Sequence, residues 1–327
     1  MKILIKISIL LLLLFPVELF STELYQQSSN SNSEIRVILL GTGYPRPQFK
    51  QFGPSTLIEI GDEKFLFDCG RGAEIRLSQI GSEYTCITKL FLTHLHSDHT
   101  VGIPDVWLSG WINCPRTKPL HVWGPAGTSN MMEHLQKAYE YDVHMRRDID
   151  EKLNPEGVMI VTREISEGIV YERGDIKITA FEVDHRLVKP AFGFRIDYKD
   201  YSIGLSGDTR PTDNLIKYCK GVDLIIHNAT SPEWFRKHAP NLSEEQIQAV
   251  LDHHTTPEQA GLIFKSISPR LAVYSHIENE PASKAELMLS TRKNYKGFVL
   301  VGEDLMAIEI GDKINVSLDG EVILTIE

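Results

Sequence analysis

Residues 93–102 read THLHSDHTVG and directly follow an apolar run at residues 87–92, ITKLFL. The stretch contains three histidines and one aspartate: His94, His96, Asp98 and His99. If the apolar run is a strand, side chains two positions apart point to the same side, so His94 and His96 share a face. Asp98 and His99 then turn toward a neighbouring point as the chain enters a helix. Imidazole and carboxylate ligands at this density predict a site for zinc or a similar divalent ion.

Three further candidate ligands stand at the ends of predicted strands. His185 and Asp208 each follow an apolar strand-like run, and His276 ends the run LAVYSH at 271–276. Each of them alone is more typical of a structural or exposed position. With the first cluster they supply five histidines and two aspartates. Such a set predicts two metal ions about 3.5–4 Å apart, with a carboxylate and a hydroxide between them.

Short strand-like runs alternate with helical stretches from residue 35 onward. A first block of predicted strands is followed by helices, and a second β-rich block at 159–206 is followed by helices again. Two sheets packed face to face, with helices outside, would bury such strands on both faces. The sequence therefore predicts an α/β fold in which residues 35–327 form one domain.

The composition is that of an ordinary globular protein. The chain has 327 residues, 42% of them hydrophobic, and only 4 cysteines, which excludes a disulfide scaffold and a disordered chain. Its 34 Lys and Arg residues stand against 44 Asp and Glu, a net charge of −10. Nucleic-acid-binding proteins usually carry a basic surface, so this balance argues against nucleic acid as the main partner.

The first 21 residues are typical of a secretory signal peptide. Lys2 and Lys6 form a basic start, and residues 7–17 form an apolar segment. An uncleaved anchor is the alternative, but the apolar run is short for a membrane span. Residues 22–34 are rich in Ser, Asn and Gln and predict a polar linker. We therefore expect an exported protein, most simply in a bacterial periplasm, with no stable membrane insertion after signal removal.

These motifs resemble the metallo-β-lactamase superfamily, and within it the ribonuclease Z-like branch. The resemblance rests on HLHSDH at 94–99, GDT at 207–209, LLGTGYPRP at 39–47, FDCGRGAE at 67–74 and the triplet His254-Thr255-Thr256. It covers nearly all of residues 35–327. It implies a four-layer αββα metallo-β-lactamase sandwich with two Zn²⁺, or similar divalent ions, at one edge.

The same resemblance implies which residues hold each ion. One zinc would be bound by His94, His96 and His185. The second would be bound by Asp98, His99 and His276. Asp208 would bridge the two ions.

Two departures from the ribonuclease Z pattern bear on the substrate. A long arm that grips tRNA is often inserted between the positions of His185 and Asp208, but here only residues 186–207 lie there. The family's His-Glu-Ala-Thr motif reads HNAT at 227–230, so Asn228 replaces a carboxylate that would orient His254. With the export signal and the acidic charge, these departures argue against tRNA.

What remains resembles the exported arylsulfatases of the superfamily, which share the signal peptide, the GTGxPxP start and the stretch FGPSTLIEIG at 52–61. Our main hypothesis is therefore an exported binuclear zinc hydrolase that cleaves small anionic sulfate esters with a metal-bridging hydroxide. One alternative is a phosphodiesterase acting on cyclic nucleotides or RNA. Another is a secreted metal-binding protein without catalysis. A homodimer is left open.

The chemistry assigns roles to a few more residues. Asp98 would orient or deprotonate the nucleophile, and His254 would protonate the leaving oxygen or steady its charge. Three basic side chains close in sequence to the predicted ligands are candidates for binding a sulfate or carboxylate group of the substrate. The alternative for each is an ordinary solvent-exposed surface charge. They are Arg186, Lys189 and Arg210.

Other residues have two interpretations. Trp107 and Trp111 are four residues apart and therefore lie on the same face of a predicted helix. The simpler interpretation is that they pack in the core, and the more specific one is that they form an aromatic wall for an aryl substrate. A buried free thiol is expected at Cys69 rather than a nucleophile. The sequence leaves open whether any disulfide joins Cys69, Cys86, Cys114 and Cys219.

Overall fold

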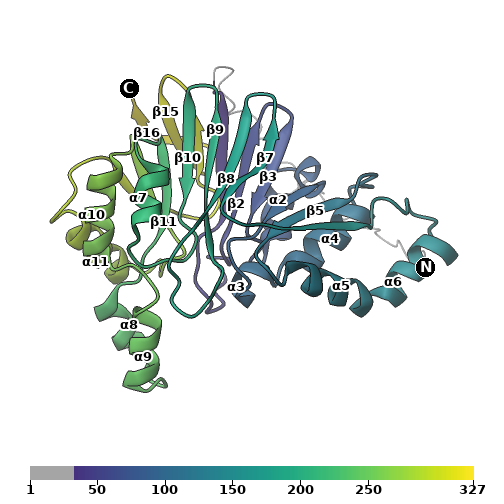
Figure 1. Ribbon diagram of the computed structural model, residues 1–327, viewed down its shortest axis with the longest axis horizontal. Helices are drawn as coiled ribbons and strands as arrows, with labels where there is room; N and C mark the ends of the chain where they lie inside the picture. Colours follow the sequence, from purple (N-terminus) through teal and green to yellow (C-terminus); the bar gives the residue numbers. More distant parts are fainter. Residues whose placement is uncertain (1–32) are drawn as a thin grey trace, which may run out of the picture.

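A computed structural model describes residues 33–327 of the chain (Figure 1). The predicted signal peptide and the predicted linker up to residue 32 lie outside the described residues. Among those described, no helix is long and apolar enough to cross a membrane.

Two mixed β-sheets form the centre of the molecule. The first contains, in spatial order, β16 (Glu321–Ile326), β15 (Ile314–Leu318), β14 (Ala307–Ile310), β1 (Ile35–Gly41), β2 (Ser55–Ile60), β3 (Glu63–Phe67), β4 (Lys89–Phe91), β5 (Leu120–Gly124) and β6 (Ile160–Glu164). The second contains β13 (Val299–Val301), β12 (Leu271–Ser275), β11 (Leu224–Asn228), β10 (Tyr201–Leu205), β9 (Phe192–Tyr198), β8 (Ile176–Glu182) and β7 (Gly168–Arg173).

Helices accompany each sheet in chain order. Those of the first half are α2 (Ala73–Ile80), the short η1 (Ser82–Thr85), α3 (Ser97–Thr100), α4 (Ile103–Ile112), α5 (Thr128–Ala138), α6 (Glu140–His144) and η2 (Met145–Ile149). Those of the second half are α7 (Asp213–Cys219), α8 (Pro232–His238), α9 (Glu244–Leu251), α10 (Pro257–Ile267) and α11 (Pro281–Thr291). Figure 1 shows α8 and α9 projecting away from the body of the sandwich.

Alternating side chains divide the strands between separate apolar layers. Val37 and Leu39 of β1 belong to the core between the sheets, whereas Ile38 packs with α2 and α4 outside the first sheet. In β11, Leu224 faces the inner core and Ile225 packs with α7 and α10 outside the second sheet. Because each fully buried aliphatic side chain contributes about 1.5–3 kcal/mol, sheets buried on both faces stabilise the fold strongly. The expected four-layer αββα sandwich is confirmed.

The strand directions bring the site together. Strands β3 to β6 run parallel, as do β10 to β13, and β8 runs with β10 because both are antiparallel to β9. Their carboxyl ends therefore meet at one edge of each sheet. Two backbone hydrogen bonds join these edges, from Phe192 N to Thr93 O (2.9 Å) and from Ile277 N to Thr42 O (2.9 Å).

The stretch GTSNMMEHLQKAYEYDV at 127–143 predicts one helix from its sequence, but the structure has two. The helix divides into α5 and α6 at Tyr139, which leaves the helical region with φ −106° and ψ 11°.

Candidate metal centre

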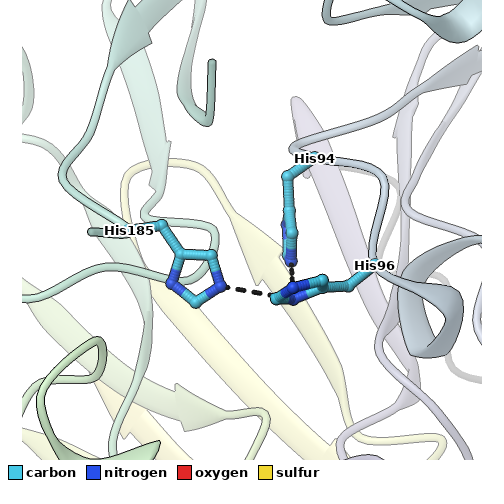
Figure 2. A group of neighbouring side chains, drawn as sticks. All are labelled: His94, His96 and His185. Atoms are coloured by element: carbon cyan, nitrogen blue, oxygen red, sulfur yellow. Dashed lines mark hydrogen bonds between the residues drawn. The ribbon is translucent and has the colours of Figure 1, made fainter. Parts of the chain in front are cut away.

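Three histidines from two strand ends converge on one point (Figure 2). His96 Nδ1 lies 3.0 Å from His94 Nε2 and 3.3 Å from His185 Nε2. His94 and His185 are fully buried. Burial lowers the pKa of both, so both rings are neutral and keep a free nitrogen lone pair. This is the donor set expected for the first metal ion.

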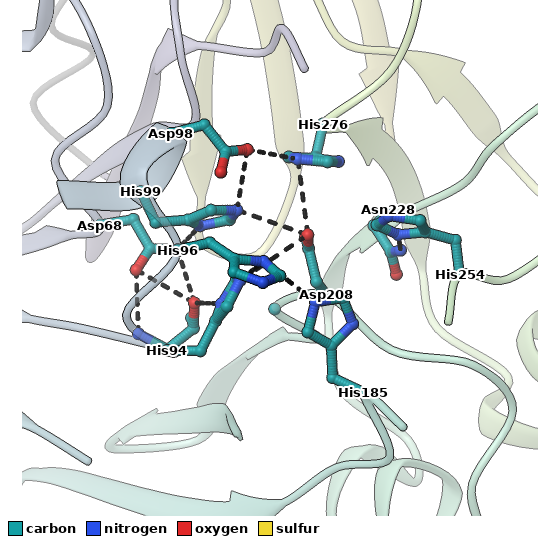
Figure 3. Close-up of polar contacts among 12 residues, drawn as sticks. Asp68, His94, His96, Asp98, His99, His185, Asp208, Asn228, His254 and His276 are labelled. Carbon is teal, nitrogen blue, oxygen red and sulfur yellow. Dashed lines mark hydrogen bonds and ion pairs between the residues drawn. The ribbon is translucent and has the colours of Figure 1, made fainter. Parts of the chain in front are cut away.

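A second group lies beside the first (Figure 3). His276 Nε2 is 3.1 Å from Asp98 Oδ2, and His99 Nε2 is 3.5 Å from the same oxygen. Asp98 and His99 enter the site from α3, one turn after His96, while His276 follows β12. His276 has a left-handed backbone (φ 52°), which is rare for a residue with a side chain and typical of functional sites.

Asp208 joins the two groups. Its Oδ2 lies 4.0 Å from His94 Nε2, 3.4 Å from His99 Nε2 and 3.4 Å from His276 Nε2. Gly207 before it has φ +58°, and a Cβ there would lie 2.7 Å from the carbonyl oxygen of Phe192. A glycine is therefore needed to turn the chain so tightly.

The donor set fits two divalent cations. The seven predicted ligands fall into the groups His94–His96–His185 and Asp98–His99–His276, with Asp208 close to both. Within residues 33–327, the buried Asp208 Oδ1 has no hydrogen-bond partner. Burial alone would raise the pKa of Asp208, but His276 and His99 hold it well below its usual range, so the carboxylate is ionised and ready to bind metal.

Asp68 orients two of the ligands, and the sequence analysis missed this role. Its Oδ2 accepts hydrogen bonds from His99 Nδ1 (2.7 Å) and from the Thr93 hydroxyl (2.9 Å). Thr93 Oγ1 lies 3.0 Å from His94 Nδ1 and, because its own proton is directed to Asp68, accepts a hydrogen bond from His94 Nδ1–H. Both imidazoles therefore turn Nε2 toward the centre. The only signal for Asp68 in the sequence is its place in the FDCGRGAE motif, which does not show which side chains it contacts.

His254 lies beside both metal groups. Its ring centroid is 5.4 Å from that of His185 and 5.5 Å from that of His276. Asn228 Nδ2 is 3.0 Å from His254 Nδ1, so the residue that replaces the family carboxylate does contact this histidine. Burial lowers the pKa of His254 to about 3, and the ring is neutral at physiological pH.

Asp98 is charged at neutral pH, in contrast to the neutral ring of His254. Burial alone would raise its pKa, but the hydrogen bond from His276 and the charge of His99 lower it to about 2. The carboxylate is therefore ionised at neutral pH and can accept a proton or bind metal.

A cavity of about 300 Å³ opens onto the centre. It reaches the metal groups through His96, Asp98, Asp208, His254 and His276. The remaining lining residues are Tyr44, Pro45, Arg46, Thr230, Phe235, Val250, His253 and Glu278. No sequence motif marked these residues as substrate contacts, because they come from separate segments: the loop after β1, the residues that follow β11 and β12, α8, and α9 with the residues after it.

The three predicted rim cations do not line this cavity. Arg210 Nε is 2.8 Å from Asp184 Oδ2, and Arg186 Nη2 is 3.9 Å from Asp252 Oδ2. Lys189 lines a separate cavity of about 520 Å³. Their role in substrate binding stays a prediction.

The aromatic wall suggested for the tryptophans is wrong. Trp107 and Trp111 are buried in the helix-facing core, with their indole N–H groups bonded to the carbonyls of Val158 and Asn154. The default interpretation, core packing, is confirmed.

The cysteines divide into one pair and two free thiols. Cys86 and Cys114 form a disulfide with a Cα–Cα distance of 5.4 Å. Cys69 and Cys219 are buried and free. Burial raises the pKa of Cys69 well above its usual value, which agrees with the expected inert thiol.

Comparisons with known proteins agree with this geometry. The sequence family described as "Anti-Pycsar protein Apyc1" matches residues 35–244. The ribonuclease Z of Mycolicibacterium gilvum (strain PYR-GCK) is 31% identical over 281 residues, 84% of this chain and 96% of the relative.

Solved structures share the fold at lower identity. The metallo-β-lactamase fold protein YhfI from Bacillus subtilis has a TM-score of 0.64 at 16% identity, covering 84% of this chain and 98% of that one. The short form of human tRNase Z has a TM-score of 0.61 at 24% identity, covering 84% and 99%.

The ribonuclease Z relative, the fold and the site together define a metal-dependent hydrolase with the metallo-β-lactamase fold. The chain belongs to the family described as anti-Pycsar protein Apyc1, in the ribonuclease Z-like branch of that superfamily. The predicted branch is thus confirmed, while the closer resemblance to arylsulfatases receives no support from these relatives.

Proposed function

We propose that the protein hydrolyses phosphodiester bonds in small substrates with two divalent metal ions, most simply Zn²⁺. The observation that carries the proposal is the arrangement of two ligand groups joined by Asp208 at one end of a cavity of about 300 Å³. A cavity of this size suits one small ligand.

The bound ions would supply Lewis acidity, polarising the phosphoryl oxygens and lowering the pKa of water. The protein's own groups handle the protons. Asp98, ionised at neutral pH, can orient a water molecule and accept its proton at Oδ. His254 can donate a hydrogen bond from Nε2 to the leaving oxygen, because Nδ1 faces the Asn228 amide.

Phosphodiesters thus replace sulfate esters as the substrate class that we favour. The relatives are named as ribonucleases, whose substrates are phosphodiesters, and they favour the phosphodiesterase alternative over the arylsulfatase hypothesis. The two ester types need similar chemistry, because each is an in-line displacement at a tetrahedral centre with charge on non-bridging oxygens. Sulfate esters therefore stay the competing substrate class.

A small substrate is proposed rather than tRNA. Residues 186–207 form a short loop and the complete β9–β10 hairpin, and the net charge is −10. The names of the relatives count against this part of the proposal, since they imply action on RNA. A competition assay between pre-tRNA and a small diester would separate the two.

The main test compares two chromogenic esters with one leaving group. We expect the zinc-loaded protein to hydrolyse bis(p-nitrophenyl) phosphate with a higher kcat/KM than p-nitrophenyl sulfate. The Asp208→Asn variant should be inactive on both and serves as the control for contaminating enzymes. The reverse order of kcat/KM would restore the arylsulfatase hypothesis. No turnover on a wide ester panel at full metal occupancy would support the non-catalytic alternative.

We also propose that the protein is exported. The sequence of residues 1–21 motivates this, and the Cys86–Cys114 disulfide supports it, because such bonds persist mainly in oxidising compartments. Mass spectrometry of the periplasmic fraction should find a mature N-terminus near residue 22. Recovery of the full-length chain in the cytoplasm would contradict the proposal.

A further inference from the structure

The cavity that opens onto the metal centre contains one acidic group outside the ligand set. Glu278 lies on its wall, two residues after His276, and is only 2% exposed. Within residues 33–327, its Oε2 atom has no hydrogen-bond partner. Buried polar atoms are almost always paired, so an unpaired carboxylate oxygen on a cavity wall points to a ligand that supplies the donor.

The backbone around Glu278 is held firmly in place. Ile277 N donates to Thr42 O at 2.9 Å, and Ile277 O accepts a hydrogen bond from Gln51 Nε2 at 3.0 Å. Gln51 also bonds the Thr42 hydroxyl at 3.2 Å. The backbone that carries Glu278 is thus fixed before any ligand arrives, as is usual for specificity-determining groups.

The other walls of the cavity are chemically distinct from Glu278. Phe235 of α8 and Val250 of α9 give an apolar side, and Tyr44 adds an aromatic ring that packs edge-on to Trp234 at 6.1 Å between centroids. The metal groups at the inner end suit the phosphoryl group. An apolar side next to a buried carboxylate suits an organic group that is largely apolar but carries an N–H or O–H donor.

We propose that Glu278 is a specificity-determining residue that accepts a hydrogen bond from an N–H or O–H donor on the organic part of the substrate. This inference rests on the proposed function of the site and narrows its substrate class to phosphoesters with such a donor, of which nucleoside phosphoesters are an example.

The test measures binding, so that it does not depend on turnover. Thymidine 5′-monophosphate carries N–H and O–H donors, whereas phenyl phosphate has none on its organic part. We expect Glu278→Gln to weaken binding of the thymidine nucleotide to the zinc-loaded protein by about ten- to a hundred-fold in calorimetry, the usual loss for a charged hydrogen bond. Phenyl phosphate should bind within about two-fold of wild type, since it makes no such bond.

The matched control is Glu280→Gln, which removes an exposed carboxylate two residues further along. It should change neither affinity. If Glu278→Gln misfolds, Glu278→Asp keeps the charge but withdraws the carboxylate by one methylene and should give the same selective loss. Equal loss for both ligands, or no loss for either, would overturn the proposal.

The proposed function is tested by a second measurement on the same protein samples, the rate of phosphodiester hydrolysis. Hydrolysis of bis(p-nitrophenyl) phosphate by the wild-type protein should be matched by the Glu280→Gln control, whose substitution lies at an exposed position. If the wild-type protein fails to cleave this ester, the proposed function fails, while the two binding affinities still decide the role of Glu278.

Discussion

The side-chain amide nitrogen of Asn228 lies 3.0 Å from Nδ1 of His254, at the position where the ribonuclease Z pattern has a glutamate. In this orientation the amide donates to Nδ1, so the neutral ring carries its proton on Nε2. A glutamate would instead accept a hydrogen bond from Nδ1–H and favour the imidazolium form. The substitution therefore keeps His254 as a neutral donor, in agreement with a pKa lowered by burial to about 3.

We predict that the importance of His254 depends on the leaving group. A neutral imidazole donates a hydrogen bond to the leaving oxygen, and an alkoxide, which carries more localised charge than a nitrophenolate, gains more from that bond; removal of one such donor typically costs about 10²–10³-fold. His254→Ala should lose little on nitrophenyl esters and far more on alkyl esters, with unchanged metal content. The measurement is a plot of log rate against leaving-group pKa for both proteins. Parallel lines would show that His254 donates no hydrogen bond to the leaving oxygen.

Asn228→Glu should move the pH profile in a known direction. A carboxylate beside Nδ1 raises the pKa of His254, so the acid form persists to higher pH. Activity on an alkyl ester that needs the acid should therefore extend to higher pH than in wild type. Asn228→Gln, which adds length without charge, is the control. An unchanged profile in Asn228→Glu would mean that His254 does not titrate in the rate-limiting step.

Asp68→Asn should weaken metal binding although Asp68 is not among the predicted ligands. The variant loses the charged acceptor that holds His99 and, through Thr93, His94. Loss of such an orienting group typically costs about 10–100-fold in metal affinity or activity. Competition with a chromogenic chelator measures the affinity, and Asp62→Asn at an exposed turn is the control. Equal affinities in the two variants would refute the orienting role.

The disulfide should contribute to stability. It joins residues 28 apart, and closing a loop of that length stabilises the folded state by about 3–4 kcal/mol in the chain-entropy treatment. The Cys86→Ser/Cys114→Ser double variant should therefore unfold at a lower temperature in calorimetry. Reductant should lower the wild-type midpoint toward that of the variant and leave the variant unchanged. A wild-type midpoint insensitive to reductant would contradict this prediction.

The ligand set could be predicted because its signals are local. His94, His96, Asp98 and His99 stand together in the chain, and the others follow apolar runs whose carboxyl ends must share an edge. The four-layer arrangement followed from the order of strand and helix blocks in the same way.

The remaining parts of the site depend on contacts that no local pattern records. Asp68 reaches His99 from 31 positions away, and the unpaired oxygen of Glu278 is visible only when its whole surroundings are known. The rim cations were chosen for closeness in sequence to the ligands. In space, Arg210 turns to Asp184, while Arg46 from a loop after β1 lines the cavity.

The central claim is a two-ion centre bridged by Asp208 that cleaves phosphodiesters. Its most direct test is a titration of metal-free protein with Zn²⁺, following both bound metal and the rate on bis(p-nitrophenyl) phosphate. We predict that binding and rate both reach their plateau at two equivalents per chain, and that Asp208→Ala loses at least one ion together with the activity. A plateau at one equivalent, or a fully loaded protein that leaves the ester intact, would contradict the claim.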